Sequence, residues 1–505
     1  MKERDHMKDS VTGVPTSCPL KTDVSFQMSS DDICHENTMF SCSEQSPALR
    51  KHPSKLFVET TTRCNLKCQA CVKQSAGNEI REGDMSMGTF TALAPTFPHL
   101  ESLVLNGIGE PLLHPLLEDF IRIAKSSMPR GSWVGFQSNG TLLTNDRAES
   151  LLAAGLDRIC LSLDSVSCDT FRDLREGGEV ADIENAISAL KAAKIRTGIT
   201  DLDIGIEVVV SLDNFRELPE VVKWAALHEV SFVIVTHLLP YNLSQSTKIA
   251  YEYNSDEAIA LYEPLKSKAE SEGIDIHRYF DIFYPPKWFR TREEQLILDF
   301  VYQMMLEANR TGIFLQVKNM FSRDELFHRE MSKIFDEAQA FAEEAGISLK
   351  LPEIVPKADR RCDFIEGGSA MVSWDGKIYP CYFLWHKFNC YHKTRVVCRE
   401  IEGKSFGNLG NTTVYDIWNG PDFKAFREEV REYRFSYCSN CNVAPCDFIW
   451  GPEFENDCSA ANVPCGDCFW CMGAVPLPAM KQERGARFEV KTKGRRGAAC
   501  RAPTG

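Results

Sequence analysis

The sequence predicts an α/β fold in which a parallel sheet is built from six β/α units. Between residues 56 and 240, six short apolar runs alternate with amphipathic stretches of helical period. Short, continuously apolar runs are typical of strands buried on both faces, as in a parallel sheet. Alternating strands and helices favour β/α units linked by crossovers. Periodicity leaves open whether the sheet curls or stays open and doubly wound.

The expected strands are the apolar runs at 56–58, 103–105, 133–136, 159–163, 204–210 and 232–235. The expected helices are the amphipathic stretches at 116–124, 146–154, 183–193 and 217–227. For the helix at 146–154, Asn145 or Asp146 is a suitable N-cap and Gly155 a suitable C-terminal stop.

Three cysteines follow the first expected strand in a Cys-x3-Cys-x2-Cys pattern, at Cys64, Cys68 and Cys71. Three thiolates this close together can hold three irons of a cubane 4Fe–4S cluster and leave the fourth iron open. An open metal position can bind a substrate or a cofactor. The alternative is part of a zinc site, but zinc normally needs a fourth Cys or His nearby, and none follows Cys71 before His99.

This motif, placed after a first strand, resembles the signature of the radical S-adenosylmethionine (SAM) enzymes. The resemblance implies a partial (β/α)6 TIM barrel with its site at the C-terminal ends of the strands. It also implies a 4Fe–4S cluster whose open iron chelates SAM, and reductive cleavage of SAM to a 5′-deoxyadenosyl radical. Ala70 departs from the family, in which an aromatic residue often contacts adenine at that position.

Polar residues at three expected strand ends resemble the SAM-binding segments of that family. The candidates are Gly107, Gly109, Glu110, Asn139, Ser162 and Asp164. The glycines let the backbone approach a ligand, and Glu110 offers a carboxylate to the methionyl ammonium. The turn around Asn139 resembles the family's Thr-Asn-Gly turn, and Ser162 and Asp164 are expected near the ribose or carboxylate of SAM. Each of these short patterns is also an ordinary turn, so their recurrence at successive strand ends is the signal.

The composition indicates a soluble globular protein of about three domains, with 505 residues, 43% hydrophobic and 25% charged. A net charge of −14 gives no reason to expect nucleic acid or an anionic membrane as partner. No apolar run approaches the roughly 18 residues that span a bilayer, and a signal-peptide core is lacking, so we expect a cytoplasmic location. Eleven of the 20 cysteines lie between Cys362 and Cys471, which suits metal ligation in a reducing compartment.

Five segments are expected along the chain. Residues 1–50 form a polar, disordered leader, 51–245 the radical SAM partial barrel, and 479–505 a basic, disordered tail. Residues 246–355 are charged and mostly helical, and either complete the barrel or dock substrate. Aromatic residues at 279–289 hint at a contact surface, although core packing is the commoner role. Residues 356–478 form a small, Cys-rich α+β domain.

The Cys-rich segment holds nine candidate metal ligands. Cys362 and Cys381 flank an expected hairpin with its turn at Asp375-Gly376, so both thiolates are expected at one cluster. The others are Cys438, Cys441, Cys446, Cys458, Cys465, Cys468 and Cys471. The pattern resembles the SPASM extension of radical SAM enzymes, which implies two auxiliary 4Fe–4S clusters, although the spacing after Cys441 departs from that family. No role is assigned to Cys18, Cys34, Cys42, Cys390 or Cys398.

The resulting hypothesis is a radical SAM/SPASM enzyme that modifies a protein, a peptide or a metalloenzyme cofactor, with ferredoxin or flavodoxin as reductant. Segments 72–74, 106–115 and 464–470 are most similar to a SPASM subgroup regarded as metalloenzyme maturases. Thioether formation or oxidation in a ribosomal peptide is the main alternative. Formylglycine maturation of sulfatases is disfavoured, because Tyr382 stands where that family normally has Asp. A zinc-binding interaction protein is the alternative of another class.

Overall fold

The computed structural model describes residues 46–433 and 468–476, apart from residues 76, 253, 284–287, 289, 314, 358–359 and 393–394 and the side chains of 392–399. The predicted ligands Cys438, Cys441, Cys446, Cys458 and Cys465 lie outside the described residues, as do Cys18, Cys34, Cys42, the tail and most of the leader. The predicted boundary between leader and barrel at residue 50 stays a prediction. Pro47–Leu49 form a helical turn in which Ala48 is buried, and its carbonyl accepts a hydrogen bond from Arg427.

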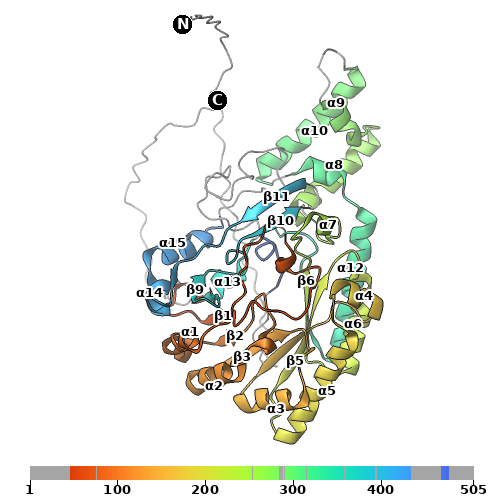
Figure 1. Ribbon diagram of the computed structural model, residues 1–505. Coiled ribbons are helices and arrows are strands. Elements are labelled where there is room, and N and C mark those ends of the chain that lie inside the picture. Colours follow the sequence, from red (N-terminus) through yellow and green to blue (C-terminus); the bar gives the residue numbers. More distant parts are fainter. Residues whose placement is uncertain are drawn as a thin grey trace, which may run out of the picture. The chain divides into compact units, whose positions relative to one another are not determined.

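One ten-stranded sheet carries the fold (Figure 1). Six parallel strands stand in sequence order: β1 (Lys55–Val58), β2 (Ser102–Val104), β3 (Trp133–Ser138), β4 (Arg158–Ser162), β5 (Asp203–Val210) and β6 (Phe232–His237). A doubly wound sheet reverses its strand order at a switch point, whereas consecutive order is that of a barrel. The predicted six-unit barrel is therefore confirmed.

Within the described residues, six α-helices lie between these strands; those at 87–91 and 168–174 were not predicted, and the other four differ from prediction only at their ends. They are α1 (Met87–Thr91), α2 (Leu117–Ser127), α3 (Asn145–Ala154), α4 (Cys168–Leu174), α5 (Val180–Thr197) and α6 (Leu218–Leu227). Figure 1 shows α2, α3, α5 and α6 along the outer side of the strands. The N-cap of α3 is Thr144, one residue before the predicted cap, because its hydroxyl accepts from the Arg147 amide. Gly155 ends α3 with a φ of 97°, as predicted.

The segment between β6 and the Cys-rich region has two parts. The first contains α7 (Leu243–Ser246), α8 (Asp256–Ser271), α9 (Tyr279–Phe283), α10 (Arg292–Thr311) and α11 (Val317–Phe321). Helices α8 to α11 share a hydrophobic core of their own, which includes Tyr279, while Phe283 is 50% exposed. The second part, α12 (Glu325–Ala345) and β7 (Ser348–Lys350), packs on α6 and pairs with β6. This second part extends the parallel sheet by one strand beyond β6.

The Cys-rich region adds α13 (Asp363–Glu366), β8 (Ser369–Val372), β9 (Lys377–Tyr379), β10 (Phe388–His392), β11 (Arg395–Ile401), β12 (Gly407–Asn408), α14 (Val414–Asn419) and α15 (Pro421–Val430). The predicted hairpin is β8–β9, with Gly376 at a φ of 82° in its turn. Strand β8 pairs in parallel with β1, so the hairpin continues the barrel sheet. The β10–β11 ribbon was not predicted.

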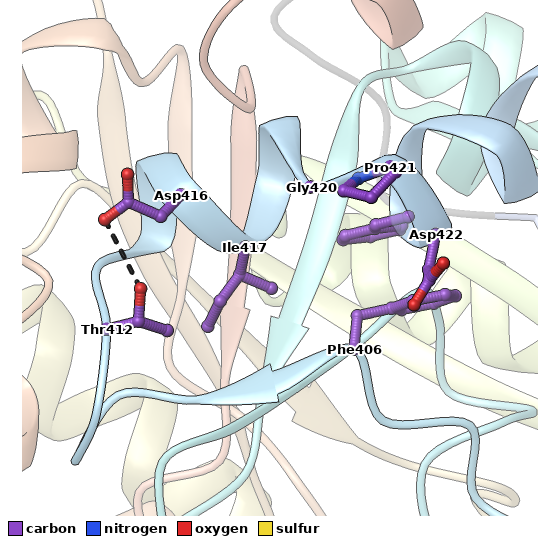
Figure 2. A pocket seen from close by; sticks show the side chains of 8 residues that line it. Phe406, Thr412, Asp416, Ile417, Gly420, Pro421 and Asp422 are labelled. Atoms are coloured by element: carbon purple, nitrogen blue, oxygen red, sulfur yellow. Dashed lines mark hydrogen bonds between the residues drawn. The ribbon is translucent and has the colours of Figure 1, made fainter.

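No helix within the described ranges is long and apolar enough to cross a membrane. A groove of about 210 Å³ lies on α14 and α15 (Figure 2). Among its lining residues, Asp416 accepts hydrogen bonds from the hydroxyls of Thr412 and Thr413, so this carboxylate is tied to the N-cap of α14, Thr413. None of the predicted site residues lines this groove.

Candidate functional site

The loop after β1 brings Cys64, Cys68 and Cys71 together at the C-terminal end of the strand, with all three thiols half-buried. Burial, together with the neighbouring sulfurs of Cys68 and Cys64, raises the pKa of Cys71 to about 11. A thiol with a raised pKa stays protonated in neutral water. It becomes thiolate, the form that binds metal, when a metal centre displaces its proton. The donor set therefore fits the predicted cluster.

The end of α4 holds this loop. The amides of Lys67 and Gln69 donate to the carbonyls of Glu176 and Leu174 at 3.0 and 3.1 Å. Between these two contacts lies Arg175, whose Nε is 2.7 Å from a carboxylate oxygen of Asp164. Burial raises the pKa of Cys68, and the guanidinium of Arg175 opposes that effect. Sequence reasoning missed Arg175, because an arginine at a helix end is usually a solvated surface residue.

The segment after β2 packs directly against the cluster loop, which is the stretch at 59–71 that carries the three cysteines. A Cβ atom on Gly109 would lie 2.4 Å from the carbonyl oxygen of Thr61, and one on Gly107 would lie 2.4 Å from Cγ of Glu59. The amide of Glu110 donates to the carbonyl of Arg63 at 2.7 Å. Both glycines are thus required by the close approach of two protein segments. The predicted approach to SAM stays a prediction.

Glu110 joins the ends of β2 and β3. Its side chain is buried, with Oε1 accepting from the Leu112 amide at 3.1 Å and the Ser138 hydroxyl at 2.8 Å, and Oε2 accepting from the Asn139 amide at 2.8 Å. Burial raises the pKa of Glu110, and these three donors oppose the rise. Three of about four acceptor positions are occupied. Contact with the SAM ammonium stays a prediction for this carboxylate.

The other predicted residues also lie at strand ends. The side-chain nitrogen Nδ2 of Asn139 is 4.0 Å from Sγ of Cys64, so the turn after β3 meets the loop that carries the three cysteines. The Ser162 hydroxyl accepts from Gln137 at 3.2 Å. Asp164 accepts from the amide of Val209 at 2.9 Å besides its pair with Arg175, so its carboxylate already has protein partners.

Glu207 on β5 is a further acidic group that sequence reasoning missed. Burial raises the pKa of Glu207, Arg175 lowers it, and Asp164 raises it; the resulting pKa is about 7. A buried carboxyl group whose pKa is raised beside the Arg175–Asp164 pair is a candidate for a functional role. Nothing in the sequence indicated such a role, because Glu207 lies within an apolar strand, where a polar residue is usually one that faces solvent.

A second group of thiols forms in the Cys-rich region from Cys362, Cys381, Cys468 and Cys471, all of them buried. The Cys471 thiol hydrogen-bonds to Cys362 and Cys468, contacts that raise its pKa. Burial raises the pKa of Cys381 strongly, and Cys362 and Cys468 add to that rise. Within the residues that the structure describes, no three His, Cys, Asp or Glu side chains are placed to hold a single metal ion. The four thiols are donors of the type that 4Fe–4S clusters use.

Family models agree with this layout. Residues 58–243 match the radical SAM superfamily, and residues 362–442 match SPASM, an iron–sulfur cluster-binding domain. The chain is therefore a radical SAM enzyme with a C-terminal SPASM domain. These domains imply a 4Fe–4S cluster, SAM and auxiliary iron–sulfur clusters, as predicted.

Among its relatives is the tungsten-containing aldehyde ferredoxin oxidoreductase cofactor-modifying protein of Pyrococcus furiosus, 28% identical over 429 residues, which are 84% of this chain and 96% of that protein. The GTP 3′,8-cyclase of Streptomyces coelicolor is 29% identical over 178 residues, 34% of this chain and 50% of the cyclase. Among solved structures, Streptococcus suis SuiB bound to SAM matches 78% of this chain and 72% of SuiB, with a TM-score of 0.44 and 11% identity.

Proposed function

We propose that this chain uses a radical generated from SAM to modify the cofactor of a metalloenzyme, in the cytoplasm and with electrons from a ferredoxin or flavodoxin. The observation that carries this proposal is the match to 96% of the Pyrococcus furiosus protein, which is named as a cofactor-modifying protein. That match includes 84% of this chain and so extends well beyond the radical SAM domain at 58–243.

Cys64, Cys68 and Cys71 are the proposed ligands of the SAM-binding cluster. When bound, the cluster and SAM supply a 5′-deoxyadenosyl radical. The contacts of the loop with Leu174 and Glu176 hold the three thiols in place, and Arg175 gives the loop a buried positive charge. A fixed charge beside thiolates favours their ionised form.

The groups proposed to contact SAM are Gly107, Gly109, Glu110, Asn139, Ser162 and Asp164. Because the carboxylates of Glu110 and Asp164 have internal partners, their first contribution is to position strand ends. Residues that orient a site in this way hold the binding groups in the required geometry before the ligand arrives.

Cys362, Cys381, Cys468 and Cys471 are the proposed ligands of one auxiliary cluster. Two come from the ends of the hairpin segment and two from a turn about ninety residues later, and their mutual contacts support this assignment. The remaining predicted ligands, Cys438, Cys441, Cys446, Cys458 and Cys465, are then the candidates for a second auxiliary cluster.

The test is to produce a tungsten- or molybdenum-dependent aldehyde oxidoreductase in cells with and without this chain. We expect the extracted cofactor to differ in mass between the two preparations, and the difference to vanish with Cys71→Ala, which removes a cluster ligand. An identical cofactor in both, while the purified chain still cleaves SAM, would contradict the proposed substrate. Modification of a ribosomal precursor peptide under the same conditions would favour the alternative.

A further inference from the structure

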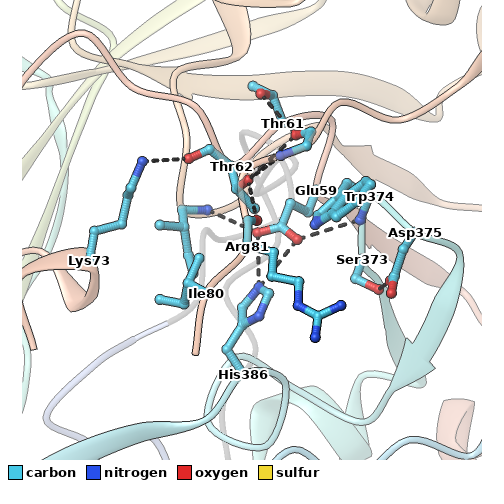
Figure 3. A network of polar contacts seen from close by, with 12 residues as sticks. Glu59, Thr61, Thr62, Lys73, Ile80, Arg81, Ser373, Trp374, Asp375 and His386 are labelled. Carbon is cyan, nitrogen blue, oxygen red and sulfur yellow. Dashed lines mark hydrogen bonds and ion pairs between the residues drawn. The ribbon is translucent and has the colours of Figure 1, made fainter. Parts of the chain in front are cut away.

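A buried carboxylate–imidazole pair lies where the barrel meets the Cys-rich hairpin. Glu59 follows β1 directly and is fully buried, and Nε2 of His386 lies 3.1 and 3.2 Å from its two carboxylate oxygens. The amides of Ile108 and Trp374 donate to the same carboxylate, each at 3.4 Å. Figure 3 shows Glu59 between the His386 ring and Trp374.

Both members adjoin segments that carry predicted ligands. Glu59 stands five residues before Cys64 and touches Gly107, which begins the candidate SAM-binding segment. His386 stands five residues after Cys381. The hydroxyl of the intervening Tyr382 donates to Asn106, next to Gly107. The pair therefore lies at the C-terminal ends of the strands, where barrel enzymes place their chemistry.

The hydrogen bond fixes what the imidazole can do. An ionised carboxylate only accepts hydrogen bonds, so Nε2 of His386 carries the proton. In neutral imidazole the other nitrogen, Nδ1, is then an acceptor. Within the described residues Nδ1 has no hydrogen-bond partner, and the side chain is 15% exposed. A carboxylate behind an imidazole also stabilises the imidazolium that forms when Nδ1 takes up a proton.

A purely structural tie would not need this pair, because a buried carboxylate costs desolvation that an apolar contact avoids. The charge of Glu59 acts on two nearby tyrosines. Burial raises the pKa of Tyr379 to about 12, and Asp375 and Glu59 contribute to the rise. Burial also raises the pKa of Tyr382 strongly, with Glu59 and Glu207 adding to it. Both phenols therefore stay protonated, so neither competes with the imidazole as a base.

We propose that His386 is the proton acceptor for the substrate of this enzyme, and that Glu59 is the residue that positions it. The substrate then carries an O–H or N–H group beside the carbon that reacts with the radical. In the step at His386 that bond breaks, an Nδ1–H bond forms, and no electron is transferred. The proton leaves to water through the exposed part of the ring. This inference rests on the proposed radical modification of a cofactor.

The first experiment needs no substrate. Holoprotein labelled with 15N-histidine is examined by NMR at alkaline pH, and the His386 signals are assigned by their loss in His386→Gln. We expect a protonated Nε2 and an unprotonated Nδ1 in the wild type, and a mixture of tautomers in Glu59→Gln, since a carboxamide can donate as well as accept. Glu82→Gln is the matched control, because Glu82 is 62% exposed and paired with Lys73. A protonated Nδ1 in the wild type, or an unchanged tautomer in Glu59→Gln, would overturn the proposal.

The second experiment uses the cofactor assay above and measures modified cofactor per 5′-deoxyadenosine released. We expect this ratio to fall at least about 100-fold in His386→Ala, the usual contribution of a general base, and to recover in part with added imidazole. A ratio equal to the wild type would refute the base. Failure of the proposed function is recognised separately, because the wild type would then give no modified cofactor at all.

Discussion

Arg175 and Asp164 form the most buried ion pair beside the cluster loop, with side chains only 11% and 6% exposed. Removing one member leaves the other charge without a partner in the interior, which typically costs about 3–5 kcal/mol. The same guanidinium influences Cys68, so its loss affects both folding and the cluster loop.

We therefore expect Arg175→Met to lower the free energy of unfolding by about 3–5 kcal/mol and to weaken cluster retention. The double variant Arg175→Met/Asp164→Asn should recover part of the stability, because no unpaired charge remains. Denaturant unfolding of Arg175→Met, Asp164→Asn and the double variant gives the coupling between the two side chains. Equal stability of Arg175→Met and wild type would contradict a stabilising ion pair.

Gly107 has no room for a side chain, because a Cβ would lie 2.4 Å from Cγ of Glu59. Gly107→Ala should cost about 1–3 kcal/mol, as overpacking does, and raise the dissociation constant for SAM by displacing the candidate binding segment. Gly88→Ala is the control, since its nearest neighbour would be 3.7 Å away. Both quantities come from thermal unfolding with and without SAM. Tight SAM binding by Gly107→Ala would show that the segment tolerates the shift.

Glu207 gives stability a pH dependence. Burial raises its folded-state pKa to about 7, above the ordinary value of 4.5, so the folded state binds more protons than the unfolded state between those values. Stability therefore falls as pH rises from about 4.5 to about 7, then levels off, with a total loss of roughly 1–3 kcal/mol. Glu207→Gln should flatten this part of the pH profile in denaturant unfolding. A profile identical to the wild type would mean that Glu207 titrates normally.

At the scale of elements, the β8–β9 hairpin and the turn at 468–471 work as a unit. Strand β8 adds to the barrel sheet beside β1, and the turn brings two further thiols to Cys362 and Cys381. The hairpin alone supplies only two donors, which is too few for a 4Fe–4S cluster.

Cys468→Ala/Cys471→Ala should therefore lower the iron content by about four atoms, one cluster. Cys390→Ala is the matched control, because Cys390 is equally buried but lies on β10. Iron analysis and solubility are measured together, since loss of a metal site can unfold a small domain. A soluble double variant with full iron would exclude these two cysteines as ligands.

At the scale of the whole molecule, one sheet connects both cysteine groups. Strand β1 leads into the loop of Cys64, Cys68 and Cys71, and its neighbour β8 belongs to the hairpin that ends near Cys381. By their contacts, the described residues fall within one compact unit, Ser43–Gly505. The barrel and the hairpin of the Cys-rich segment thus share one continuous sheet.

Anaerobically reconstituted protein should contain about twelve irons, four for each of three clusters. With a strong reductant and SAM it should release 5′-deoxyadenosine and methionine, and Cys71→Ala should abolish this release. Metal analysis and chromatography of the nucleoside measure the two quantities. Stoichiometric zinc without iron would instead favour the interaction-protein alternative.

The sequence alone determined the features that depend on neighbouring residues. These are the six β/α units, the motif at Cys64, Cys68 and Cys71, the glycine-containing strand end at 107–110 and the hairpin turn at Gly376. Each has a local cause, such as apolar period, ligand spacing or backbone conformation.

Only the tertiary structure decided which distant residues meet. It joined Cys362 and Cys381 to Cys468 and Cys471, placed Arg175 beside Cys68, and paired Glu59 with His386, 327 residues later in the chain. It also occupied the carboxylates of Glu110 and Asp164 with protein partners. None of these contacts leaves a periodic or spacing signal, because each is created by strands and loops that are neighbours only in the folded sheet.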